Sequence, residues 1–489
     1  MFRFPDLTQD IRIFLSTGLV ISPWLAGVDS GDRFDAELFH LIDYVARDIV
    51  SAHWSEQVQI LVFHNMPTPE RIPRTAIYEI IASTAVYLAI EERSSAIVDE
   101  AIVQKALRMV EDYISIHGMA TLILIYALVT SYENHQAVSY YGSIPERQFT
   151  LGSWHRPWVD YSLSDELLLG SLSGALRVVV REGRRLVELT EDGSEFMNQN
   201  ADMLEQSGYL QHRMRMQHIL QFTLFDDYED LAEQVIPNGM ELRKVFIDSI
   251  NIQPDMRVLE VGCGSGTLTF GAGLADLVGP SGRIVGVDPS SGMLQRAELA
   301  RRLRGVGWVE FTLASAEQLP VPDQSFDATI GSAFLHFTDI HQAVAEMARA
   351  TRKGGVIASL HPLQIKYYPP FFLEWFDPVL KLSREFFRVR KPYLLEGSDV
   401  IAAFREAAIK NIETMDLSLI ALFDDPDKVI RHFIHGIGMF QEVLTQIPWR
   451  ARHELIETLL DNGRRIVGQY QQQDLVMAFP TQVVKGIVV

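Results

Sequence analysis

The sequence contains a single cysteine, Cys263, among its 489 residues. One cysteine can form neither an intrachain disulfide framework nor a thiolate-rich metal site. Small folds stabilised by disulfides or by a thiolate-bound metal are therefore excluded. We therefore expect a cytoplasmic protein of a reducing compartment, and we expect no metal in its active site.

Long apolar runs are also scarce. Asp6 and Asp10 interrupt the apolar N-terminal segment, which has no basic leader, and this argues against a signal peptide. The longest apolar run, Met119 to Thr130, falls short of the roughly 20 residues that a membrane-spanning helix needs. We expect a core helix at this run and no membrane span.

Basic residues are in deficit. Lys and Arg number 43 against 63 Asp and Glu, which gives a formal net charge of −20 and a pI near 5.1. A dispersed acidic surface repels phosphate backbones. The charge balance therefore disfavours nucleic acid as a partner.

The sequence is long, and its pattern of apolar and polar residues changes along the chain. A chain of 55.3 kDa exceeds a single hydrophobic core, so we expect several domains. From Asp35 to about Tyr132 the apolar residues recur at helical spacing. This spacing predicts a mainly helical N-terminal domain over residues 1–145.

The second segment, residues 146–235, combines a predicted hairpin with an acidic linker. Apolar and polar residues alternate on both sides of Glu182-Gly183, the pattern of two antiparallel strands, and a helix is expected after the turn from Thr190 to Gly193. Helices followed by such a hairpin resemble a winged-helix domain. That fold either reads DNA or serves as a packing and dimerisation module; because no basic stripe is present, we favour packing, which allows a homodimer through the N-terminal domain.

The pattern of apolar and polar residues changes again in residues 236–489. Short apolar runs of strand length alternate with helical or turn-rich sequence, and the tail reads as one or two closing strands. This alternation predicts a doubly wound, Rossmann-like α/β domain with helices on both faces of a largely parallel sheet.

The first of these runs ends in a glycine loop, VLEVGCGSG. Glycines there let a ligand approach the backbone. The dinucleotide fingerprint G-x-G-x-x-G needs its third glycine at position 267, which is Thr267. A dinucleotide is therefore disfavoured.

The loop from Glu260 to Gly266 instead resembles the first motif of the class I S-adenosylmethionine-dependent methyltransferases, acidic-x-G-x-G-x-G. Asp288 with the following SSGML, and the stretch SFDATIGSAFLHF, are similar to later motifs of small-molecule members of the ubiquinone and menaquinone type. The resemblance implies a seven-stranded methyltransferase sheet that closes with an antiparallel pair. It also implies S-adenosyl-L-methionine as methyl donor and S-adenosyl-L-homocysteine as product.

The resemblance also implies which residues contact the cofactor. Asp288 would hold the ribose hydroxyls through charge-assisted hydrogen bonds. Relatives meet the adenine amino group with an aspartate where this chain has Ser315, so Ser315, the backbone of Ala316 and Glu317 all stay open for that contact. The predicted cofactor-binding residues are Glu260, Gly262, Gly264, Gly266, Asp288, Pro289, Met293, Ser315, Ala316, Glu317 and Ser332.

Two histidines near the carboxyl ends of later strands, His336 and His361, are candidate general bases, and catalysis by proximity alone is the alternative. An aromatic-rich insertion at about residues 363–410 is expected to form a lid. Its rings either contact the substrate or pack the lid against the sheet. The predicted lid contacts are Tyr367, Tyr368, Phe371, Phe372 and Trp375.

Together these features predict methyl transfer from S-adenosylmethionine to a small, fairly apolar or aromatic metabolite, with O- or C-methylation favoured. The alternative hypothesis is a winged-helix transcriptional regulator that binds S-adenosylmethionine without methyltransferase activity.

Overall fold

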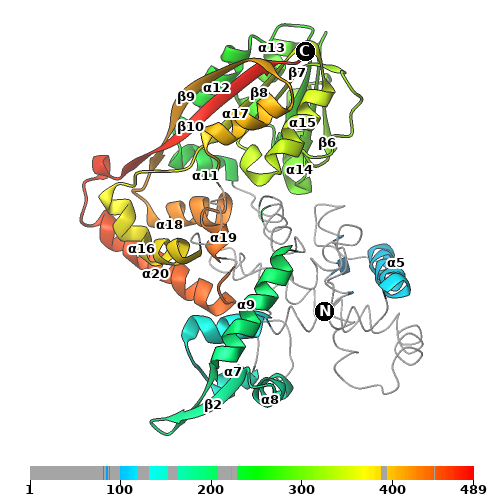
Figure 1. Cartoon of the computed structure of the whole chain (residues 1–489). Coiled ribbons are helices and arrows are strands. Elements are labelled where there is room, and N and C mark those ends of the chain that lie inside the picture. Colours follow the sequence, from blue (N-terminus) through cyan, green and yellow to red (C-terminus); the bar gives the residue numbers. More distant parts are fainter. Residues whose placement is uncertain are drawn as a thin grey trace. The chain divides into compact units, whose positions relative to one another are not determined.

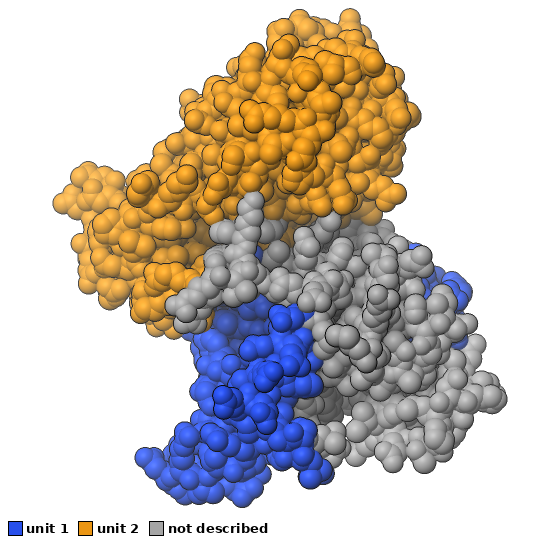
Figure 2. Space-filling model, viewed as in Figure 1, with its two compact units in different colours: residues 1–217, 441–457 blue, residues 218–440, 458–489 orange. Residues whose placement is uncertain are grey.

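The computed structural model describes residues 81, 84, 85, 88, 100–117, 132–151, 164–206, 218, 222, 228–386, 394–444 and 446–489. Contacts between residues group the chain into two compact units, 1–217 with 441–457 and 218–440 with 458–489 (Figure 2). The domain boundaries expected at residues 145 and 235 stay predictions. The predicted helix at Met119–Thr130 lies outside the described residues, as does most of the helical block before residue 132. None of the described helices is long and apolar enough to cross a membrane.

The first unit contains the predicted hairpin. Strands β2 and β3 pair antiparallel, and β1 pairs with β3 on its other side. Glu182 and Gly183 at the turn have φ of 50° and 74°, as a type I′ hairpin turn requires. The hairpin is confirmed, whereas the winged-helix identity stays a prediction. The elements of this unit include α5 (Glu100–His117), β1 (Ile144–Pro145), α7 (Glu146–Leu151), α8 (Ser164–Leu172), β2 (Leu176–Arg181), β3 (Arg184–Leu189), α9 (Glu191–Gln206) and α19 (Gln441–Leu444).

Helix α9 begins earlier than the sequence predicts. The expected turn after Thr190 is wrong, because Thr190 caps the helix: its Oγ1 accepts from the N–H of Gly193 at 2.9 Å. Gly193 then lies in the first turn of α9, where a Cβ would come within 2.0 Å of the carbonyl oxygen of Ala175. Its glycine serves this close packing rather than a turn.

Three of the four arginines of the hairpin are paired with carboxylates. Arg177 and Arg181 contact Glu188 at 3.0 and 2.6 Å, and Arg185 pairs with Glu146. Guanidinium groups held in this way are less available to phosphates. This pairing agrees with a packing role for the segment, and no finding favours the transcriptional regulator.

The second unit is built on a seven-stranded sheet in the order β6-β5-β4-β7-β8-β10-β9 (Figure 1). Neighbouring strands from β6 to β8 are parallel, and β10 is antiparallel to both β8 and β9. The predicted Rossmann-like fold is confirmed. The strands are β4 (Arg257–Val261), β5 (Arg283–Asp288), β6 (Val309–Leu313), β7 (Phe326–Ser332), β8 (Thr351–Pro362), β9 (Lys410–Leu422) and β10 (Val476–Ile487).

Helices cover both faces of this sheet because successive strand residues point to opposite sides. Val258 packs in the core formed with α12 (Gly239–Ile250) and α13 (Leu274–Val278), while its neighbour Leu259 packs in the core formed with α15 (Ile340–Ala350) and α17 (Gly397–Glu406). The other elements of this unit are α11 (Tyr228–Val235), η3 (Thr267–Gly271), α14 (Ser291–Arg304), η4 (Leu335–Phe337), α16 (Pro370–Phe386), α18 (Pro426–Val429), η5 (Ile430–Gly436) and η6 (Gln472–Asp474). Helix α20 (Trp449–Val467) is divided between the units, with residues 449–457 in the first and 458–467 in the second.

The edge strand β9 is not among the predicted strands. The side-chain amide of Asn238 borders it, since Nδ2 donates to the carbonyl of Ser418 at 2.9 Å and Oδ1 accepts from the N–H of Ile420 at 2.8 Å. An amide side chain thus satisfies two backbone groups that an edge strand would otherwise leave open.

Replacing Asn238 by alanine removes both of these hydrogen bonds, each worth about 0.5–1.5 kcal/mol. We expect the amide of Ile420 to exchange with solvent several-fold faster, measured by hydrogen–deuterium exchange. The exposed Glu233→Ala variant serves as the control. Unchanged exchange in Asn238→Ala would contradict the edge-capping role.

Candidate functional site

The glycine loop lies directly after β4, where the order of the strands reverses between β5 and β7. Such a reversal point is where open α/β sheets bind their ligands. The N–H groups of Gly262 and Cys263 both donate to the carbonyl of Val287 in β5, at 2.8 and 3.0 Å. The loop is therefore fixed against β5 before any ligand arrives.

The three glycines of the loop all have positive φ, but they serve different purposes. A Cβ at Gly262 would come within 2.4 Å of the Phe334 side chain, and one at Gly266 within 2.8 Å of Phe270. A Cβ at Gly264 would meet only the sulfur of Met293, at 3.9 Å. Gly262 and Gly266 thus admit neighbouring rings, and Gly264 is the position with room for a ligand.

Asp288, at the end of β5, is the carboxylate around which the loop is arranged. Its Oδ2 accepts from the N–H of Gly264 at 2.9 Å and its Oδ1 from the N–H of Ser290 at 2.8 Å. Burial raises the pKa of Asp288 to about 6, although both backbone hydrogen bonds lower it. A carboxylate has about four acceptor positions, so roughly two remain for the hydroxyls of a ligand.

Glu260, in β4, is buried beside Asp288 and accepts from the hydroxyl of Thr269. Burial raises the pKa of Glu260 to about 8; the Thr269 hydrogen bond lowers it, the charge of Asp288 raises it and Arg243 lowers it. Two buried acidic groups with raised pKa values favour a cationic ligand, because a nearby positive charge stabilises their ionised forms.

The loop after β6 holds the three residues proposed for the adenine. Ser315 donates its hydroxyl to Glu317, and Glu317 Oε1 accepts from the N–H of Asp339 at 2.9 Å. Ala316 is buried between them, and the N–H of Ala314 donates to the carbonyl of Asp288 at 3.1 Å. The carboxylate of Glu317 thus braces this loop, and the adenine contact expected from Ser315, Ala316 or Glu317 stays a prediction.

Helix α14 begins next to Asp288. Pro289 directly follows the carboxylate, and the N–H of Met293 donates to Ser290 Oγ at the helix cap. Arg296, one turn further on, donates to the sulfur of Met293 and to the carbonyl of Phe222. It also contacts Glu229 at 3.7 Å, so it ties the start of α11 to the predicted cofactor site.

The end of β7 carries a strained backbone. Ser332 is the last residue of the strand, and the next residue, Ala333, has φ of 58°, an unfavourable value for a residue with a side chain. Its N–H donates to the carbonyl of Leu360 at 2.7 Å, which holds the turn. This turn leads into η4, which carries His336.

The two predicted bases are neutral imidazoles, of which His361 is fully buried and His336 partly buried. Burial lowers the pKa of His336 to about 3 and that of His361 to about 4. His336 packs on Phe337 with ring centroids 4.0 Å apart, and His361 Nδ1 lies 3.3 Å from the hydroxyl of Ser359. After burial, the charges of His218 and His361 also lower the pKa of His336.

The predicted lid residues separate into two groups. Phe371, Phe372 and Trp375 are fully buried in α16 and pack around Phe423. Tyr368 stacks on Phe372 at 4.9 Å, and Tyr367 is 90% exposed. The three buried rings therefore pack within the protein, which is one of the two roles that the sequence left open for them. A substrate role for the five residues stays a prediction.

An array of aromatic rings near η4 was not predicted as part of the site. Phe337 contacts Phe222 at 5.5 Å, Phe222 contacts Tyr228 at 5.6 Å, and Tyr228 stacks on His432 at 5.8 Å. His432 lies on η5, a π-helical segment of the kind often found at functional sites. In the sequence, Phe222 and Tyr228 stand in what reads as an acidic linker, and no local pattern marks them.

Among the described residues, no group of three or more His, Cys, Asp or Glu could hold a metal ion.

Comparison with known proteins identifies the relatives of this unit. Residues 259–359 match the family model described as "Methyltransferase domain". A demethylmenaquinone methyltransferase of Geobacillus kaustophilus is 33% identical over 187 residues, which are 36% of this chain and 79% of the relative. The ubiquinone/menaquinone biosynthesis C-methyltransferase UbiE of Hahella chejuensis is 38% identical over 130 residues, 26% of this chain and 51% of the relative.

Among solved structures, a SAM-dependent methyltransferase of Aquifex aeolicus aligns at 18% identity with a TM-score of 0.30, and the alignment covers 40% of this chain and 93% of that one. A likeness at that score adds nothing to the assignment of function.

The different purposes of the glycines can be separated by substitution. Gly262→Ala places a methyl group against Phe334, whereas Gly264→Ala meets only the backbone cost of positive φ, about 1 kcal/mol. We expect Gly262→Ala to lower the midpoint of thermal unfolding more than Gly264→Ala, and Phe334→Ala to restore part of the loss in the Gly262→Ala background. Additive effects in the double variant would contradict the assigned contact.

Proposed function

Because this chain belongs to the class I S-adenosylmethionine-dependent methyltransferases, we propose that it transfers the methyl group to carbon or oxygen of a small, apolar or aromatic molecule. The family relationship rests on a relative that is 33% identical and matched over 79% of its length. Methyl transfer from S-adenosylmethionine follows from that relationship, and the substrate class is our proposal.

The printed names of the relatives support an aromatic or quinone-type substrate. Both the Geobacillus and the Hahella proteins are named for methylation in menaquinone or ubiquinone biosynthesis, and the latter is named a C-methyltransferase. The rings of Phe222, Tyr228 and Phe337 beside η4 have the character that a flat, apolar molecule needs from its surroundings.

The residues after β4 and β5 fit the methyl donor. We propose that Gly264 leaves space for it, that Asp288 accepts from its ribose hydroxyls, and that the loop at Ser315 meets the adenine. When bound, S-adenosylmethionine supplies an electrophilic methyl group on a sulfonium centre. The acidic pair Glu260 and Asp288 favours that positive charge.

The histidines have a more limited role than that of strong bases. An imidazole with a pKa near 3 or 4 is a weak proton acceptor at neutral pH, because efficient general bases have pKa values near the working pH. A neutral imidazole can still orient a hydroxyl by a hydrogen bond. We therefore propose that His336 and His361 position the substrate, and that orientation supplies most of the rate, on the order of 7–11 kcal/mol.

Binding of the methyl donor should depend on pH through Asp288. The ionised carboxylate is the form that accepts from ribose hydroxyls, and its pKa in the free protein is about 6. We expect the affinity, measured by calorimetry, to fall about tenfold per pH unit below 6. The affinity of Asp288→Asn should not fall in this way below pH 6, and the affinity of Glu260→Gln should still fall. An equal fall in affinity in Asp288→Asn would contradict the assignment.

The same two carboxyl groups contribute to the pH dependence of stability. Folding raises both pKa values, so the protonated forms are favoured in the folded state, and the stability they contribute is present at low pH and lost as pH rises through about 6 and about 8.

The substrate class is tested by incubating the protein with isotopically labelled methyl donor and a metabolite extract, followed by mass spectrometry. We expect labelled products of apolar or aromatic character, and their fragmentation distinguishes a carbon–methyl from an oxygen–methyl bond. Label found only in protein, nucleic acid or charged amines would contradict the proposed substrate class.

A further inference from the structure

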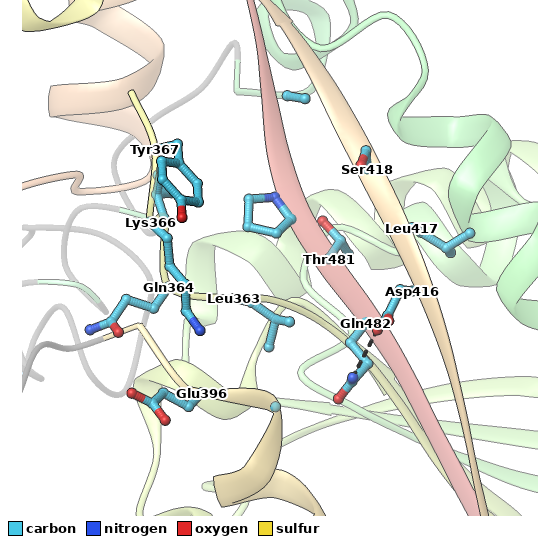
Figure 3. Close-up of a pocket in the computed structure, with 14 residues that line it drawn as sticks. Leu363, Gln364, Lys366, Tyr367, Glu396, Asp416, Leu417, Ser418, Thr481 and Gln482 are labelled. Atoms are coloured by element: carbon cyan, nitrogen blue, oxygen red, sulfur yellow. Dashed lines mark hydrogen bonds between the residues drawn. The ribbon is translucent and has the colours of Figure 1, made fainter. Parts of the chain in front are cut away.

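A groove of about 630 Å³ (Figure 3) is lined in part by β9 and β10, the two strands at the end of the sheet opposite β6. Its walls come from the segment after β8, from the start of α17 and from β9 and β10. It shares no lining residue with the predicted cofactor site. Because β10 is three strands away from β4, these two strands are about 14 Å apart at the usual strand spacing.

The groove is built around a buried amide. Gln482, in β10, is 8% exposed, and its Nε2 donates to Oδ1 of Asp416 in β9 at 2.9 Å. This bond fixes the orientation of the amide, because the reverse orientation would set the amide oxygen against the carboxylate. Gln482 Oε1 has no hydrogen-bond partner among the described residues, and a buried acceptor in that state is destabilising.

A glycine lies beside this oxygen. This glycine is Gly397, the first residue of α17, where a Cβ would come within 2.9 Å of the oxygen. Both residues line the groove, and the amide oxygen lies just beneath its surface, with less than 1 Å² exposed. A ligand that donates a hydrogen bond there would complete the bonding of Gln482.

The charged groups of the groove favour a positive donor. Asp416 and Glu396 contribute two carboxylates and Lys366 one ammonium group, within a chain of net charge −20. The ring of Tyr367, 90% exposed, stands on the wall opposite Asp416 (Figure 3) and offers an aromatic face to a cation. A volume of this size is typical of sites for small molecules.

We propose that this groove is a second small-molecule site, which binds a primary ammonium group between Gln482 Oε1 and the carboxylate of Asp416. The ammonium group supplies the donor that Gln482 lacks and neutralises the excess of carboxylates. Because residues 363–367 lead from β8 directly into α16, a ligand in the groove contacts the base of the predicted lid.

The full-length protein is titrated with butylammonium, butyrate and 4-aminobutyrate by calorimetry. Butylammonium is expected to bind and butyrate is not, while 4-aminobutyrate distinguishes a plain amine from a zwitterion that also uses Lys366. Equal binding of butylammonium and butyrate, or no binding of butylammonium up to its highest practical concentration, overturns the proposal.

Variants locate the binding. Gly397→Ala, a change compatible with its place in a helix, should weaken butylammonium binding about tenfold or more, because its methyl group covers Gln482 Oε1. Asp416→Asn keeps an acceptor for Gln482 Nε2, removes the charge and should weaken binding several-fold. Asp474→Asn removes one equally exposed charge outside the groove and should leave binding unchanged. Circular dichroism verifies that each variant is folded. Unaltered affinity in both Gly397→Ala and Asp416→Asn overturns the assigned position.

Discussion

The pair of hydrogen bonds to the carboxylate of Asp288 is the interaction on which the geometry of the predicted donor site depends. One oxygen holds the amide of Gly264 in the loop after β4, and the other holds the amide of Ser290 at the start of α14. Because both bonds form within the protein, the loop has its shape without a ligand. Burial of Asp288 also raises the pKa of its carboxyl group. The two hydrogen bonds that shape the loop therefore depend on the ionisation state of Asp288.

The central part of the fold could be predicted from the sequence because each parallel strand is buried on both faces and reads as a short apolar run, as RVLEV and RIVGVD do. β9 could not, since it is an edge strand with an exposed and irregular pattern. The start of α9 was misplaced for a local reason: Thr-Glu-Asp-Gly serves equally well as a turn and as a helix cap followed by the first helical turn.

The residues of the candidate site could be predicted from the sequence, but their contacts and their burial could not. The three glycines are visible in the sequence, yet the reason for Gly262 is the ring of Phe334, which belongs to the turn after β7 and comes close only through the pairing of β4 with β7. His336 and His361 could be named as candidates, whereas their low pKa values follow from burial that no local pattern reveals. Tyr228 and His432 are far apart in the chain, and only the fold stacks their rings.

The electrostatics of the proposed site differ between its two sides. Asp288, with a pKa of about 6, is negatively charged at neutral pH, and Glu260, with a pKa of about 8, ionises more readily beside a positively charged donor, whereas His336 and the rings of Phe337 and Tyr228 are uncharged at neutral pH. A positively charged donor is favoured on the acidic side, and an apolar substrate is favoured on the neutral side, because a charged substrate there would lose its hydration without gaining a partner. Methyl transfer removes the positive charge from the donor, so the acidic side favours the departing product less than the donor. This asymmetry supplies a physical reason for exchange of product for fresh donor after each transfer.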